Sequence, residues 1–149
     1  MLTLSVAVPG FVLLRGMSRP DFVPGNRLWW LALAPVLLSA AVAFELLSVP
    51  IDAWHARMMG HNSLNCLTII PLLSLPPFVT VIYALRSGAP ANPTMAGAIG
   101  GLLSAGIAAT LYASNCTDDS PLFVGLWYPI GFALMATLGA WTGSKILPW

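Results

Sequence analysis

The sequence predicts an all-α fold, a polytopic transmembrane helix bundle that forms one integral membrane domain over residues 1–149. Of the 149 residues, 58% are hydrophobic and only 7% are charged, whereas a soluble domain has about 25% charged residues. Mean hydropathy is +0.84. Four apolar stretches have about the length, roughly 20 residues, at which a helix crosses the hydrocarbon core. Composition and segment length therefore both place the chain in the bilayer.

The four full spans are predicted at residues 28–47, 64–85, 95–114 and 122–141. The opening stretch, 1–14, is apolar but short, and Pro9 and Gly10 break it, so it predicts only a partial span. It has no basic n-region of the kind that begins a signal peptide. We expect it to be the end of a helix whose beginning is missing. Prolines within the second and fourth spans are interpreted as structural kinks rather than as the broken helices of a transporter.

Basic residues alternate between loops and predict the orientation. They lie before the first full span, after the second and after the fourth, at Arg15, Arg19, Arg27, Arg86 and Lys145. The positive-inside rule makes these loops and the C-terminus cytoplasmic. The chain is accordingly predicted to be a multi-pass inner-membrane protein. The loop 52–61 and the turn 115–121 then face outward.

Two cysteines lie near the predicted outer face, because Cys66 begins the second full span and Cys116 follows the third. A disulfide could persist there, and the alternative is two buried residues that never meet. His61, Asp118 and Asp119 lie in the same outer loops and could support a soft-metal site, of which the metal is unknown. No tight ligand spacing such as CxxC occurs, so solvated loop and capping roles are preferred for these three residues.

Glu45 is the one ionisable residue within a full span, and it lies near the outer end of that span. It is either solvated at the interface or part of a proton relay. The spans contain no basic residue that could be its partner in a relay, which weakens the case for a transporter. Gly97, Gly101, Ala105 and Ala109 recur every four residues in the third span. Such a stripe allows close helix approach, which we expect to serve packing within the bundle.

Several classes of protein are excluded or disfavoured. The net charge of +1 gives no basic field for a nucleic acid. The sequence has no P-loop and no GxSxG, and nothing in it predicts a cofactor or an enzyme. A small transporter subunit and a structural membrane subunit stay open as alternatives to a regulator.

Short segments spread over the chain resemble a known family. They are 115–123 (NCTDDSPLF), 127–128 (WY), the end 143–149, 63–67 (SLNCL), 86–90 (RSGAP) and 8–10 (VPG). In their order along the chain, these segments resemble the NrsF family of bacterial membrane anti-sigma factors, negative regulators of sigma F. The resemblance covers nearly the whole chain.

The resemblance implies a negative regulator that holds an extracytoplasmic-function sigma factor inactive at the bilayer until stress on the outer side releases it. Cys66 and Cys116 match the paired cysteines of the family, which makes them the candidate sensor of oxidants or thiophilic metals. Family members have about six transmembrane helices and a short cytoplasmic N-terminal segment. We therefore expect this chain to be truncated at its N-terminus, and it would lack any sigma-factor contacts that reside in the missing portion.

Overall fold

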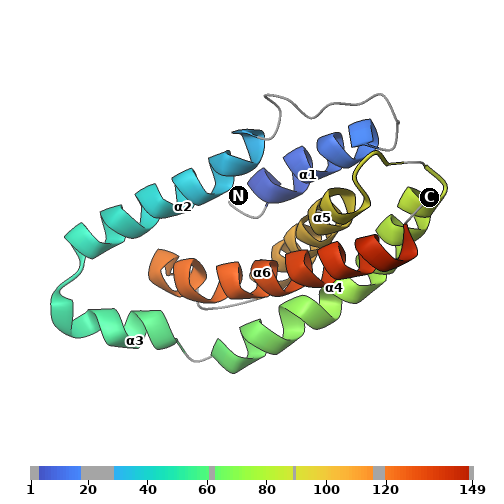
Figure 1. The fold of residues 1–149 in the computed structure, drawn as a ribbon. Helices are drawn as coiled ribbons and strands as arrows, with labels where there is room; N and C mark the ends of the chain where they lie inside the picture. The colour runs from blue at the N-terminus through green and yellow to red at the C-terminus, as the bar shows by residue number, and fades with distance from the viewer. Residues whose placement is uncertain (1–3, 18–28, 61–62, 89, 116–119, 148–149) are drawn as a thin grey trace.

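The structure is a computed structural model that describes residues 4–17, 29–60, 63–88, 90–115 and 120–147. These residues form six α-helices and one 3-10 helix, and no strand occurs among them (Figure 1). The elements are α1 Leu4–Met17, α2 Trp29–Ser48, η2 Ile51–Ala53, α3 Trp54–Met59, α4 Ser63–Arg86, α5 Pro93–Ala113 and α6 Pro121–Ile146. The predicted all-α fold is confirmed; α2, α4 and α5 coincide closely with three of the predicted spans, and α6 contains the fourth and ends five residues later. The prediction that Pro9 and Gly10 break the opening stretch is wrong, since α1 continues through both.

Helix α5 lies at the centre of the bundle, where it contacts α1, α4 and α6 (Figure 1). Its buried residues are mainly glycine and alanine, and these small side chains allow three helices to approach one axis. Helix α2 is peripheral and packs only against α1 and α6 among its main contacts. Much of its apolar surface is uncovered, including Phe44 and Leu47.

The contact between α5 and α6 depends on glycine. A Cβ atom at Gly97 would overlap the carbonyl oxygen of Gly139, and a Cβ atom at Gly101 would overlap that of Met135. At these positions the two backbones touch, so no larger residue fits without moving a helix. The prediction that the small-residue stripe serves packing within the bundle is therefore confirmed.

The prolines do not end the helices that contain them, since α4 continues through Pro71, Pro76 and Pro77 and α6 through Pro129. The buried hydroxyls of Ser74 and Ser104 donate to carbonyls of their own helices, at 2.6 and 2.8 Å. Every buried side-chain polar atom in the described part of the chain has a partner. The described interior is therefore a packed core with satisfied polar groups, and the kinks stay a prediction.

Helices α4, α5 and α6 are long and apolar enough to cross a bilayer. Large apolar side chains of the bundle also point outward, among them Leu72, Val79, Leu111 and Trp141. In α1 and α2 the described apolar stretches, Ala7–Gly16 and Ala32–Ser48, are shorter. Crossing of a membrane, and the number of spans, stay predictions.

Charge is segregated between the two ends of the bundle. Arg15, Arg86 and Lys145 lie in the last turns of α1, α4 and α6, which all end on the side where the C-terminus lies (Figure 1). Arg57 lies at the opposite end, beside the end of α2. The first three residues follow the charge alternation on which the predicted orientation depends, and Arg57 is the exception to it.

Candidate functional site

The most elaborate polar site in the described residues surrounds Glu45, in the last turn of α2. The Glu45 residue is 6% exposed, although it belongs to the most weakly packed long helix. A buried carboxylate has a large desolvation cost unless donors and a positive charge compensate it. Of the two interpretations of Glu45, solvation at the interface does not fit this burial, and the surroundings of Glu45 supply that compensation.

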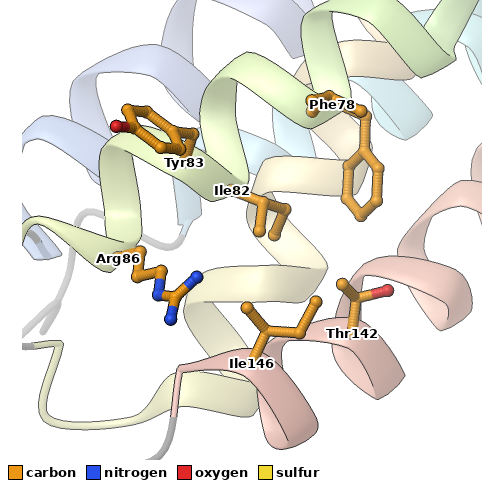
Figure 2. A pocket seen from close by; sticks show the side chains of 7 residues that line it. Phe78, Ile82, Tyr83, Arg86, Thr142 and Ile146 are labelled. Carbon is orange, nitrogen blue, oxygen red and sulfur yellow. The ribbon is translucent and has the colours of Figure 1, made fainter.

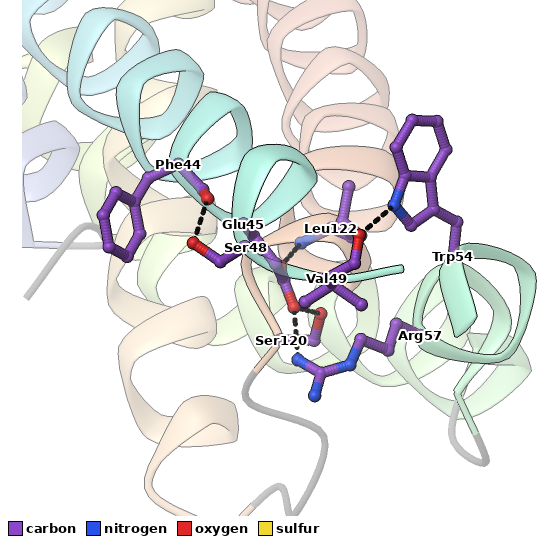
Figure 3. A network of polar contacts seen from close by, with 8 residues as sticks. All are labelled: Phe44, Glu45, Ser48, Val49, Trp54, Arg57, Ser120 and Leu122. Atoms are coloured by element: carbon purple, nitrogen blue, oxygen red, sulfur yellow. Dashed lines mark hydrogen bonds and ion pairs between the residues drawn. The ribbon is translucent and has the colours of Figure 1, made fainter. Parts of the chain in front are cut away.

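Three donors meet the Glu45 carboxylate, as Figure 3 shows. Arg57 Nη1 donates to Oε1 at 2.8 Å, and Ser120 Oγ donates to the same oxygen at 2.7 Å. The backbone N–H of Leu122 donates to Oε2 at 2.7 Å. The donors come from α3 and from the start of α6, so this one side chain ties α2 to two other elements.

Glu45 acts as the cap of a helix to which it does not belong. Ser120 is the N-cap residue of α6 and Pro121 is its first residue, but the Ser120 hydroxyl caps no backbone N–H. The Leu122 N–H donates its hydrogen bond to the Glu45 carboxylate instead. A negative charge at a helix N-terminus is also favoured by the helix dipole.

The segment that carries Arg57 is helical, although the sequence predicts a loop over residues 52–61. Here η2 and α3 follow one another from Ile51 to Met59, and Gly60, with φ of 54°, ends α3. Two indole groups fasten this segment: Trp54 Nε1 donates to the Val49 carbonyl at 3.1 Å, and Trp127 Nε1 donates to the Met58 carbonyl at 3.0 Å. The segment is thereby held against α6.

The structure gives a clear position to one of the predicted sensor residues. Cys66 lies in the first turn of α4, is 0% exposed, and belongs to a buried cluster with Ile70, Ala108, Phe123 and Tyr128. The cluster spans α4, α5 and the first turns of α6, the helix that Glu45 caps.

Cys116, His61, Asp118 and Asp119 lie outside the described residues. Among the residues that are described, no group of three or more His, Cys, Asp or Glu side chains could hold a metal ion. The proposed pairing of the two cysteines and the supporting roles of the other three residues therefore stay predictions.

Sequence reasoning singled out Glu45 but missed its partners. Arg57 is 12 positions away and Ser120 is 75 positions away, so no local spacing connects them. A usable signal was present: Arg57 is the basic residue that interrupts the otherwise regular charge alternation, on the side where Glu45 lies. A lone carboxylate and a lone arginine at one predicted depth predict an ion pair.

Comparison with known proteins gives a consistent result. The family described as NrsF, negative regulator of sigma F, matches residues 1–149. The anti-sigma-F factor NrsF of Caulobacter vibrioides is 31% identical over 147 residues, which are 97% of this chain and 68% of that protein. The probable anti-sigma-F factor NrsF of Azospira oryzae is 32% identical over 143 residues, 93% of this chain and 65% of the relative. The chain thus spans about two thirds of each relative's length. No solved structure matches it.

Proposed function

Because the chain belongs to the NrsF family, a regulatory and non-enzymatic kind of protein, we propose that it is a membrane-embedded negative regulator of a sigma factor. The sigma factor is of the extracytoplasmic-function type, and it is held inactive at the cytoplasmic side of the bacterial inner membrane. The observation that carries this proposal is the family match over the entire chain.

Two features of the described residues support the location in a membrane. Helices α4, α5 and α6 are long and apolar enough to cross the bilayer, and large apolar side chains cover their outer faces. The basic last turns of α1, α4 and α6 lie together at one end, which the positive-inside rule would make cytoplasmic.

In this proposal the signal is a change in the chemical state of Cys66 and Cys116. Formation of a disulfide would join the two sulfurs, transfer two electrons to an oxidant and release two protons, and reduction would reverse the step. A soft metal would instead bind the thiolates, with His61, Asp118 or Asp119 as further ligands. Because Cys66 is completely buried, a reaction that reaches it requires the packing of α4, α5 and α6 around it to open.

The packing around Cys66 offers a route from this reaction to the other end. The Cys66 cluster includes the first turns of α6, and the later part of α6, from Met135 to Gly143, touches α5 through the glycine contacts. A displaced α6 therefore moves its last turn, which carries Lys145, at the opposite end. The Glu45 bonds hold the start of α6 in place, so they resist this displacement.

The proposal is tested by co-expression of the full chain, tagged at its C-terminus, with each sigma factor of its own genome. We expect one sigma factor to co-purify with the detergent-extracted chain, and transcription from its target promoter to fall when the chain is present. Exposure to oxidant or soft metal should restore transcription, and substitution of either cysteine by serine should abolish the restoration.

Retention of no sigma factor by a chain that is folded and in the membrane fraction would refute the regulatory function. It would favour the structural membrane subunit. Restored transcription in both serine variants would refute only the sensing role of the cysteines.

A further inference from the structure

A groove lies between the last turns of α4 and α6, at the end of the bundle opposite to Glu45 (Figures 1 and 2). Its volume is about 230 Å³. Six of the residues that line it are Phe78, Ile82, Tyr83, Arg86, Thr142 and Ile146. Figure 2 shows the Arg86 guanidinium turned toward the space between the two helices, on the side of Ile82 and Ile146.

The groove combines an apolar wall with a single charge. Phe78 and Ile82 form its buried floor, and Ile146 is half exposed at its rim. The hydroxyl of Thr142 already donates to the Leu138 carbonyl of its own helix at 2.7 Å. Arg86 is therefore the one charged group of the lining, and no described residue forms an ion pair with it.

We propose that this groove binds an anionic phospholipid, with the phosphate on Arg86 and an acyl chain along Phe78, Ile82 and Ile146. The inference rests on the proposed membrane location, which puts Arg86 at the cytoplasmic headgroup level and the apolar wall at the level of the acyl chains. Basic pockets between transmembrane helices on this side are suited to anionic headgroups. A guanidinium presents two N–H groups to a phosphate, and within the described part of the chain no ion pair occupies Arg86.

If a lipid binds in this groove, binding should depend on the charge of Arg86 and on the open volume of the groove. Two pairs of variants test these two requirements separately. Arg86→Gln removes the charge from the groove, and Lys145→Gln removes an equal charge from the same end without touching the lining. Thr142→Phe fills the groove at constant charge. Its control is Thr137→Phe, since Thr137 lies on the same helix, is exposed and also bonds only to its own helix.

The experiment uses the full chain in detergent micelles, with dioleoyl phosphatidylglycerol or dioleoyl phosphatidylcholine added, and counts retained lipids by native mass spectrometry. The intact chain should retain phosphatidylglycerol in preference to phosphatidylcholine. Arg86→Gln should weaken phosphatidylglycerol binding about fivefold, the loss expected for one basic group at an anionic surface. Lys145→Gln and Thr137→Phe should bind like the intact chain, and Thr142→Phe should lose both lipids.

Equal losses in Arg86→Gln and Lys145→Gln would show diffuse attraction to the basic end and would overturn the site. Equal retention of the two lipids by the intact chain would do the same. Flotation of the chain with lipid vesicles is measured in parallel. A chain that fails to float refutes the membrane location itself, whereas a chain that floats without lipid preference refutes the groove alone.

Discussion

Replacement of Glu45 by glutamine tests whether capping of α6 or the ion pair with Arg57 matters more to the bundle. Glutamine keeps the size of the side chain but has one acceptor oxygen, so it cannot accept from both Ser120 and Leu122 N–H at the positions of Oε1 and Oε2. Loss of a charge-assisted bond in a buried site costs about 1.5–3 kcal/mol. We therefore expect the free energy of unfolding to fall by about 2–3 kcal/mol.

The matched variant is Arg57→Gln, which removes the other partner of the same ion pair. The side chain of Arg57 is 50% exposed, so solvent screens the pair and reduces its value to about 0.2–1 kcal/mol. Glu45 also keeps its bonds with Ser120 and Leu122 N–H in this variant. We expect Arg57→Gln to cost less than half as much as Glu45→Gln.

The assay is reversible unfolding in mixed micelles with increasing SDS, followed by far-ultraviolet circular dichroism, for the intact chain and both variants. The double variant completes a cycle that isolates the coupling between the two side chains. A larger loss in Arg57→Gln than in Glu45→Gln would mean that the ion pair, and not the cap, holds this end together. It would refute the assignment of Glu45 as the cap of α6.

Three further predictions concern other contacts. Gly139→Ala should lower the free energy of unfolding by about 1–3 kcal/mol, because the new Cβ overlaps α5. In the control Gly131→Ala the new Cβ meets a methyl group at 3.5 Å, so the free energy of unfolding should stay the same or rise by about 0.5–1 kcal/mol. Equal melting of the two variants would contradict the close contact. In a Cys116→Ala background, Cys66 should resist maleimide in native membranes and react once SDS unfolds the chain; rapid native labelling would show that Cys66 is accessible. Trp127→Phe should cost about 0.5–1.5 kcal/mol and speed proteolysis of α3, because α3 loses the indole donor; an unchanged cleavage rate would show that this bond does not hold α3.

The sequence predicts the helices well because each is a long apolar run bounded by turn residues and charges. The last helix illustrates this, since Ser120 and Pro121 mark its start and the structure begins α6 at Pro121. The helical character of η2 and α3 was missed, because a nine-residue segment with charges at Asp52 and Arg57 resembles a loop. The bond from Trp127 of α6 to the Met58 carbonyl fixes this helix from 69 positions away, and local sequence does not encode such a bond.

The candidate site was predictable only in part, for a related reason. Burial of Glu45 requires donors from two other elements, so it is a property of the assembled bundle and not of the α2 sequence. The glycine stripe was easier to interpret, because Gly97 and Gly101 recur at the helical period and small residues have one main use between helices. Periodic packing can be recognised in one sequence, whereas a polar bond between distant segments needs the fold.

The difference between α2 and α5 suggests why a carboxylate is buried at this end. In a bilayer, lipid chains are as apolar as leucine, so apolar surface alone gives α2 little reason to stay on the bundle. Helix α5 stays because glycine brings backbones into contact, but α2 has few such contacts and exposes Phe44 and Leu47. Polar bonds that would otherwise go unmade are the remaining means of attachment, and Glu45 supplies three of them. If the membrane location is correct, Glu45→Gln should therefore loosen α2 from α6 before the α5–α6 pair separates, and hydrogen exchange should show this order.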